Sequence, residues 1–240
     1  MNKAEVASFF QRLAERIPEP RTELESVNDY TLLVAVVLSA QATDAGVNLA
    51  TRALFREVRT PEQMLALGEE RLKDHIKTIG LFNTKARNVI ALSRALVEHH
   101  GGRVPANRDA LEALPGVGRK TANVVMNCAF GAETFAVDTH VFRVANRTGL
   151  APGKTVLEVE TKLDRLTPAP FRRHAHHWLI LHGRYVCKAR RPECWRCVVR
   201  DLCRYRPKTP APGSVEEKRA APSRGAPGKA GAAAGGGPGL

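Results

Sequence analysis

Long apolar stretches are absent from this chain of 240 residues. The longest uninterrupted apolar run, Leu32 to Leu38, is far shorter than the roughly 18 residues that a membrane-spanning helix needs. The N-terminus lacks the features of a targeting segment, because Lys3 is followed at once by Glu5 and a helical pattern. We therefore expect a cytoplasmic protein with no membrane-embedded segment.

The alternation of apolar and polar residues that marks a half-buried strand is also missing. Apolar residues recur at helical spacing instead, and Tyr30 to Leu38, apolar on all sides, fits a buried helix. Asn83 is suited to cap a helix that begins at Thr84. The pattern predicts an all-α fold of about ten short helices. The expected helices cover about 4–16, 30–38, 44–55, 61–67, 69–76, 84–99, 108–113, 119–130, 139–148, 155–166 and 170–187.

Acidic residues are scarce relative to basic ones: 24 Asp and Glu stand against 37 Lys and Arg, a formal net charge of +13. Such an excess favours a polyanionic partner, nucleic acid before an anionic membrane surface, over a merely basic soluble protein. In residues 207–240, 14 of 34 residues are Pro or Gly, which predicts a disordered tail. A solvated tail without a specific role is a simpler interpretation than a weak polyanion contact through its five basic residues.

Cysteine is rare, yet four of the five cysteines lie within residues 187–203. In a reducing compartment, Cys187, Cys194, Cys197 and Cys203 indicate a metal site rather than disulfides. Structural zinc sites usually contain two C-x2-C pairs, and here only Cys194 and Cys197 are so spaced. Iron–sulfur clusters accept more varied spacing. The spacing favours iron–sulfur over zinc and leaves both open.

The remaining sulfur and imidazole groups have simpler interpretations. Cys128 lies on an apolar helix face and fits a buried core thiol. Four histidines precede the cysteine cluster, and their spacing suits a basic helix face better than a second metal site. They are His174, His176, His177 and His182.

A glycine-rich turn, Leu114-Pro115-Gly116-Val117-Gly118, leads directly into a helix that starts near Arg119. Asn107 can begin a short helix before the turn. A helix that follows a glycine turn presents unpaired backbone N–H groups, which bind phosphate without needing a side chain. Residues 108–127 therefore predict a helix-hairpin-helix motif that holds a nucleic-acid backbone.

Lys120 and Asp138 suggest chemistry beside this phosphate site. A deprotonated lysine amine attacks a carbon that bears two heteroatoms and forms a Schiff base, and on DNA that carbon is the sugar C1′. The helix dipole and Arg119 disfavour the charged form of the amine. A nearby carboxylate stabilises the oxocarbenium-like state of glycosidic cleavage. The simpler alternatives are that Lys120 only contacts phosphate and that Asp138 only caps a helix.

Three motifs together resemble the endonuclease III family of iron–sulfur DNA glycosylases with abasic-site lyase activity. They are Leu114 to Asn123, the run Val137-Asp138-Thr139-His140-Val141-Phe142-Arg143, and the spacing Cys187-x6-Cys194-x2-Cys197-x5-Cys203. The resemblance covers about residues 5–205. It implies a [4Fe–4S] cluster on the four cysteines, Lys120 as the nucleophile and Asp138 as its acidic partner. One departure is Trp195, where related loops often have a small residue.

The resemblance also implies a two-lobed architecture. One lobe would comprise residues 22–133 and end in the hairpin, and the other would combine residues 1–21 with residues 134–206 and carry the cluster. The expected partner is double-stranded DNA that contains damaged pyrimidines or abasic sites, bound by a monomer associated with the nucleoid. Gln41 and Leu81 match positions that fill the gap left by an extruded nucleotide, although each also fits an ordinary packing role. The expected DNA contacts are Gln41, Leu81, Gly116, Val117, Gly118, Arg119, His140, Lys188, Arg190 and Arg191.

Two alternatives remain at this stage. A related glycosylase that removes adenine opposite damaged guanine shares the hairpin and cluster, but it generally lacks the lysine and carries a folded C-terminal domain. A non-enzymatic iron–sulfur module would use the hairpin only to hold DNA and would need Lys120 only for affinity. The lysine and the low-complexity tail speak against the adenine glycosylase. The resemblance implies a glycosylase that excises oxidised pyrimidines and nicks the product by β-elimination.

Overall fold

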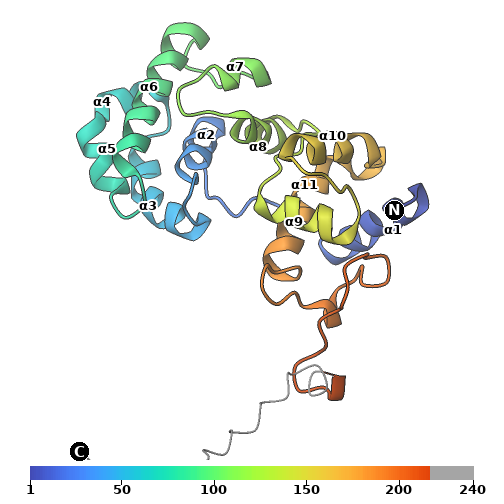
Figure 1. The fold of residues 1–240 in the computed structure, drawn as a ribbon. Coiled ribbons are helices and arrows are strands. Elements are labelled where there is room, and N and C mark those ends of the chain that lie inside the picture. The colour runs from blue at the N-terminus through green and yellow to red at the C-terminus, as the bar shows by residue number, and fades with distance from the viewer. Residues whose placement is uncertain (217–240) are drawn as a thin grey trace, which may run out of the picture.

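The computed structural model describes residues 1–216, and this part of the chain is helical and contains no strand (Figure 1). The all-α prediction is confirmed. No helix within these residues has both the length and the apolar character needed to cross a membrane. The α-helices are α1 (Lys3–Arg16), α2 (Asp29–Leu38), α3 (Asp44–Glu57), α4 (Pro61–Leu67), α5 (Glu69–Ile76), α6 (Phe82–His100), α7 (Arg108–Glu112), α8 (Arg119–Phe130), α9 (Thr139–Thr148), α10 (Val156–Leu166) and α11 (Arg172–Tyr185). Two short 3₁₀ turns, η1 (Ala169–Phe171) and η2 (Cys194–Arg196), complete the set.

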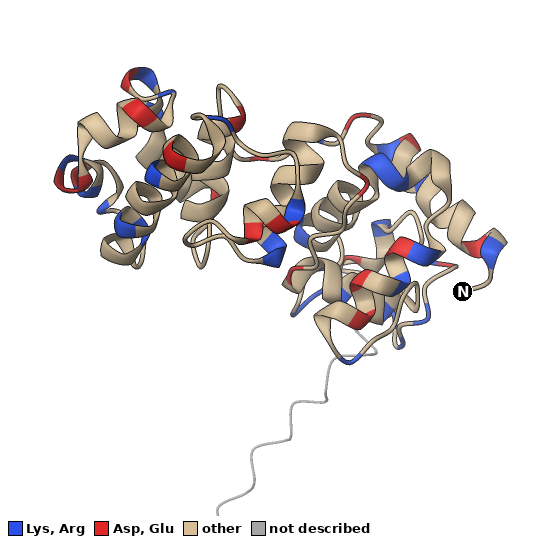
Figure 2. Cartoon of the chain, turned by 90° about the horizontal axis from the view of Figure 1, so that it is seen from above, with Lys and Arg blue, Asp and Glu red and all other residues tan. Residues whose placement is uncertain are grey.

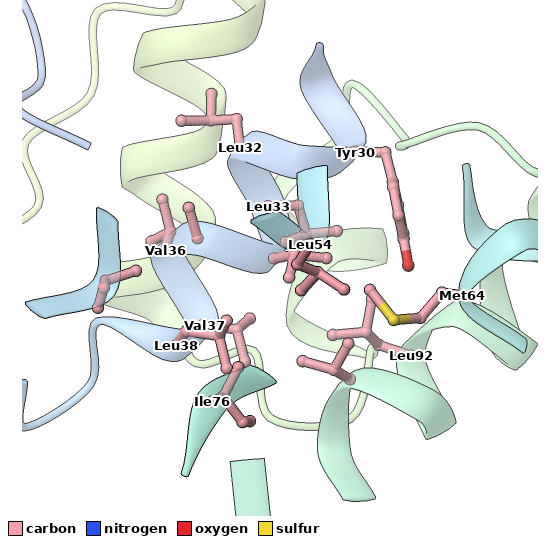
Figure 3. Close-up of a cluster of buried hydrophobic side chains, with 14 of the residues drawn as sticks. Tyr30, Leu32, Leu33, Val36, Val37, Leu38, Leu54, Met64, Ile76 and Leu92 are labelled. Carbon is pink, nitrogen blue, oxygen red and sulfur yellow. The ribbon is translucent and has the colours of Figure 1, made fainter. Parts of the chain in front are cut away.

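Helix α2 is the centre of a first core, which includes buried residues from Leu24 to Val125 (Figure 3). Every residue of α2 after Asp29 is buried, as expected for a helix that is apolar on all sides. Asn28 and Thr31 form a capping box that fixes where the helix begins. Helices α3, α6 and α8 pack directly against α2. The central helix thereby positions α8, which follows the hairpin turn.

A second core joins the two ends of the described chain. Phe9 and Phe10 of α1 are fully buried among residues of α9, α10 and α11. The Phe10 ring stacks on Phe171, and the indole of Trp178 donates a hydrogen bond of 2.7 Å to the carbonyl of Ile17. Residues 135–199 supply the rest of this core. The helix at the start of the chain is therefore held by segments that are far away in sequence.

The N-terminus of α6 differs from the sequence expectation. The helix begins at Phe82, and the preceding residue is Leu81 rather than Asn83. Leu81 adopts a left-handed conformation (φ 59°), and no side chain caps the helix. The prediction that Asn83 caps this helix is wrong because the reversal at Leu81 already turns the chain into helical geometry.

Charge is divided unequally along the chain, and Figure 2 marks the basic and acidic residues on the ribbon. Residues 22–133 contain 13 basic and 13 acidic residues, whereas residues 1–21 and 134–206 together contain 19 basic and 9 acidic residues. The part of the chain that builds the first core is thus electrically neutral, and the part that builds the second core carries the positive charge. The predicted tail lies largely outside the described residues, and residues 207–214 form no helix or strand.

The packing of α2 predicts a sharp contrast between two leucines. Leu33 is fully buried on α2, whereas Leu49 on α3 is 69% exposed. We expect Leu33→Ala to lower the free energy of unfolding by about 2–5 kcal/mol, because it removes buried methyl groups and leaves a cavity. The control Leu49→Ala is expected to change it by less than about 0.5 kcal/mol. Chemical denaturation measures both, and equal effects would contradict the central role of α2.

Candidate functional site

The glycine turn between α7 and α8 has the geometry of a helix-hairpin-helix. The Asn107 side chain caps α7 by accepting from the N–H of Ala110 (3.0 Å). Gly116 adopts φ 76°, and a Cβ there would lie 2.9 Å from the Asn88 side chain. Both the backbone conformation and the lack of space therefore require glycine at this position. Gly118 precedes α8 without a side-chain cap. The first backbone N–H groups of α8 are therefore left for an external anion.

The Arg119 side chain makes an internal contact. It forms a bidentate ion pair with Glu160 of α10, in which the shortest distance, 2.7 Å, joins Arg119 Nη2 and Glu160 Oε1. Asn123 donates both to Glu160 (3.2 Å) and to the carbonyl of Phe135 (3.1 Å). These contacts fix the start of α8 against the second core and against the segment that leads to Asp138.

Lys120 and Asp138 line one cavity of about 310 Å³. Lys120 is exposed in the first turn of α8. Asp138 caps α9, and its Oδ1 accepts from the N–H groups of His140 (2.9 Å) and Val141 (2.8 Å). The predicted cap is confirmed. Because Oδ1 makes both hydrogen bonds, Oδ2 takes no part in the cap.

Helix α11 forms another wall of the cavity, and its histidines differ from the sequence expectation. His176, His177 and His182 are buried rather than on a basic helix face. Burial is the main cause that lowers the pKa of His176 to about 3 and the pKa values of His177 and His182 to about 4 each. The prediction of a basic face is wrong because the apolar stripe of α11 turns these rings inward, where they are neutral.

Arg184 also lines this cavity and was not predicted. Its guanidinium forms ion pairs with Asp44 of α3 (2.6 Å) and with Glu23. All three residues line the cavity. The pairs join α11 of the second core to the start of α3 in the first core. Since the partners are separated by at least 140 residues along the chain, no local sequence pattern marks them.

Gln41 and Leu81 share an unusual backbone state. They are the two non-glycine residues with positive φ, 54° and 59°, among residues 1–216. Both are exposed, and Gln41 lines the cavity beside Lys120. Non-glycine residues in this conformation cost of order 1–3 kcal/mol and cluster at functional sites.

The other expected DNA contacts are distributed differently. Val117 is buried, and the His140 ring nitrogen Nδ1 lies 3.1 Å from the Arg143 guanidinium. Lys188 pairs with Glu193 (2.7 Å), while Arg190 and Arg191 are exposed on the same loop. Arg147 of α9 fixes this loop by donating hydrogen bonds to the carbonyls of Lys188 and Ala189.

The four clustered cysteines are unpaired thiols in one loop that packs on the second core. Cys194 and Cys203 are each 9% exposed, and burial raises the pKa of Cys197 to about 11. Burial also raises the pKa of Cys187, and the neighbouring Arg147 and Arg143 guanidinium groups oppose that rise. Four thiols with adjacent guanidinium groups fit a centre that binds thiolates. Among residues 1–216, no three His, Cys, Asp or Glu side chains are placed to hold one metal ion, so geometry does not choose between zinc and iron–sulfur.

Comparison with known proteins resolves that choice. Residues 34–169 match the model of the HhH-GPD superfamily of base excision DNA repair proteins. Residues 187–203 match the iron–sulfur binding domain of endonuclease III. These bounds begin and end at Cys187 and Cys203, the outer members of the cluster.

Full-length relatives agree with these matches. Endonuclease III of Haemophilus influenzae is 57% identical over 208 residues, and that of Escherichia coli K12 is 58% identical over 208 residues, each alignment covering 87% of this chain and 99% of the relative. A structure of a trapped endonuclease III–DNA covalent intermediate superimposes with a TM-score of 0.80 at 45% identity, covering 85% of this chain and 96% of the other. The chain therefore belongs to the endonuclease III family and is a base excision repair DNA glycosylase and abasic-site lyase with a [4Fe–4S] cluster.

Proposed function

We propose that this enzyme excises oxidised pyrimidines from duplex DNA through a Schiff base on Lys120. The observation that carries the proposal is the shared cavity of Lys120 and Asp138 next to the hairpin turn. The Lys120 amine forms a bond to C1′ while the bond from C1′ to the base breaks, and the base leaves with the electron pair and takes up a proton. The bond from C1′ to the ring oxygen O4′ then breaks, the oxygen takes up a proton, and the nitrogen lone pair forms the imine. The resulting imine makes the 2′-hydrogen acidic, so the 3′-phosphate departs by β-elimination.

Asp138 supports two parts of this scheme. With Oδ1 bound to two backbone N–H groups, the carboxylate is fixed in one orientation before DNA arrives. Its negative charge stabilises the positive charge that develops at the sugar, and it accepts a proton from the Lys120 ammonium or from an attacking water. Its capping role and its chemical role are therefore compatible.

DNA binding follows from charge and from the exposed loops. The N–H groups at the start of α8 bind a phosphate, and the basic part of the chain that builds the second core supplies the general attraction, which also favours association with the nucleoid. Arg119 contributes through its backbone, because its side chain holds Glu160. Gln41 and Leu81 enter the duplex when the damaged nucleotide is extruded, a step that costs a few kcal/mol. All of these groups belong to one chain, which is consistent with a monomer.

The cysteines Cys187, Cys194, Cys197 and Cys203 are the proposed ligands of the cluster. When bound, the cluster ties the loop of residues 187–203 into one conformation. That conformation presents Lys188, Arg190 and Arg191 together toward the DNA backbone.

The two alternative functions are less well supported. The relatives are named endonuclease III rather than adenine glycosylases. A solved endonuclease III structure that this chain resembles is described as a trapped covalent intermediate with DNA. A binding-only module has no use for a lysine and a carboxylate in one cavity.

Trapping with sodium borohydride tests the nucleophile. Wild-type enzyme should form a covalent adduct with a duplex that carries one thymine glycol, because borohydride reduces the imine. Lys120→Ala should bind the same duplex and form no adduct. The control Lys77→Ala, at an exposed lysine outside the cavity, should form as much adduct as wild type. Absence of an adduct in wild type that binds DNA would exclude the lyase mechanism.

Asp138→Asn separates capping from chemistry. Asparagine caps helices about as well as aspartate, so the melting temperature should stay close to that of wild type. The single-turnover rate of base release should nevertheless fall by about 10²–10⁴-fold, because the negative charge is lost. An unchanged rate of base release would mean that Asp138 only caps α9 and has no chemical role.

A further inference from the structure

Helix α11 places His176 in the wall of the cavity that holds Lys120 and Asp138. Its side chain is 1% exposed, so almost none of the ring meets solvent. Burial is the main cause that lowers the pKa of His176 to about 3, and the neighbouring His177 and Lys120 side chains also disfavour its protonation. The ring is therefore a neutral imidazole at physiological pH, with one N–H donor and one acceptor.

The hydrogen bonding of His176 differs from that of its neighbours on α11. His177 Nε2 lies 3.6 Å from the Cys128 sulfur, and His182 Nε2 lies 3.6 Å from the Cys197 sulfur. The Nδ1 atom of His176, in contrast, is fully buried and has no hydrogen-bond partner among the described residues. Buried polar groups without partners are uncommon, and each one calls for an explanation.

The burial of Nδ1 indicates which nitrogen carries the proton. An N–H group buried without an acceptor is more costly than an unpaired lone pair, so the proton belongs on Nε2. Nδ1 is fully enclosed, so the slight exposed area of this cavity-lining side chain lies elsewhere, and of the two ring nitrogens only Nε2 can reach the cavity. Nε2 is therefore the one ring nitrogen that can offer an N–H donor to the cavity.

We infer that His176 donates a hydrogen bond from Nε2 to a carbonyl oxygen of the extruded pyrimidine and so helps to select the base. This inference rests on the proposed function, because it takes the cavity beside Lys120 as the place where the extruded base binds. A neutral donor suits this position, since a second cation beside Lys120 would be repelled. His176 contacts the base and takes no part in the Lys120 chemistry. Its loss should affect excision and leave cleavage of abasic DNA intact.

The test compares two reactions of the cluster-containing holoenzyme. One is single-turnover release of thymine glycol from a duplex, and the other is cleavage of the same duplex with an abasic site already in place. We expect His176→Phe, which keeps a ring but removes the donor, to slow base release by at least about tenfold. Cleavage of the abasic site should stay within about twofold of wild type.

Two further variants separate hydrogen bonding from shape. His176→Gln carries an amide N–H₂ near the position of Nε2 and should restore most of the base release. The control His174→Phe alters the same helix outside this cavity and should leave both reactions unchanged. The thermal melt and the cluster absorbance show whether His176→Phe folds. If it does not fold, His176→Gln tests the inference instead. Base release by His176→Gln near the wild-type rate supports the inference, and equal losses of base release and abasic-site cleavage overturn it.

Three results would overturn the inference. The first is unchanged base release in His176→Phe. The second is an equal loss of base release and abasic-site cleavage in His176→Phe, which would mean that His176 acts together with Lys120. The third is base release in His176→Gln that is as slow as in His176→Phe. Failure of the proposed function would look different, because wild type itself would then give no borohydride adduct.

Discussion

The carboxylate of Glu160 is the contact on which the geometry of the site depends. It is 12% exposed, and it holds both Arg119 and Asn123 at the start of α8. Asn123 in turn binds the carbonyl of Phe135, three residues before Asp138. Lys120 lies between these two anchored residues in sequence. One carboxylate therefore sets Lys120, the proposed nucleophile, and the segment that carries Asp138 at a fixed separation, which is the preorganisation that the proposed mechanism requires.

The two cores contribute different physical properties. The first core is neutral overall and provides the rigid packing around α2, from which the hairpin and the loops of Gln41 and Leu81 project. The second core provides positive charge and the cysteine loop. Arg184 joins the two by its ion pairs with Glu23 and Asp44. In the proposed function, attraction to DNA and placement of the base are thus properties of different parts of the chain, combined at one cavity.

Local signals in the sequence were sufficient for some parts of the structure. Helical periodicity predicted the α-helices, and short-range caps such as Asp138 were predicted from residue type and position. The motifs around Lys120 and the four cysteines predicted the family. The assignment of individual catalytic and DNA-contact residues, and the division into lobes at residues 22 and 133, stay predictions.

Long-range features were beyond sequence reasoning. The partners of Arg119 and Arg184 lie 41 and at least 140 residues away, so nothing near either residue identifies them. The histidines of α11 were assigned to a basic surface because their polarity suggested exposure, whereas packing places three of them inside. The start of α6 was missed because a leucine rarely adopts the left-handed conformation that Leu81 has. Each error arose where tertiary packing outweighed a local preference.

The position of α1 in the second core has a consequence for synthesis on the ribosome. Phe9 and Phe10 emerge before the residues that bury them, which begin at Phe135. At about 5–20 residues per second, the intervening translation takes on the order of ten seconds. During that time the segments of the first core can pack on one another, while α1 exposes its aromatic face. Newly made chains therefore pass through a stage in which the N-terminal helix is available to chaperones, and that stage ends only when α11 has been translated.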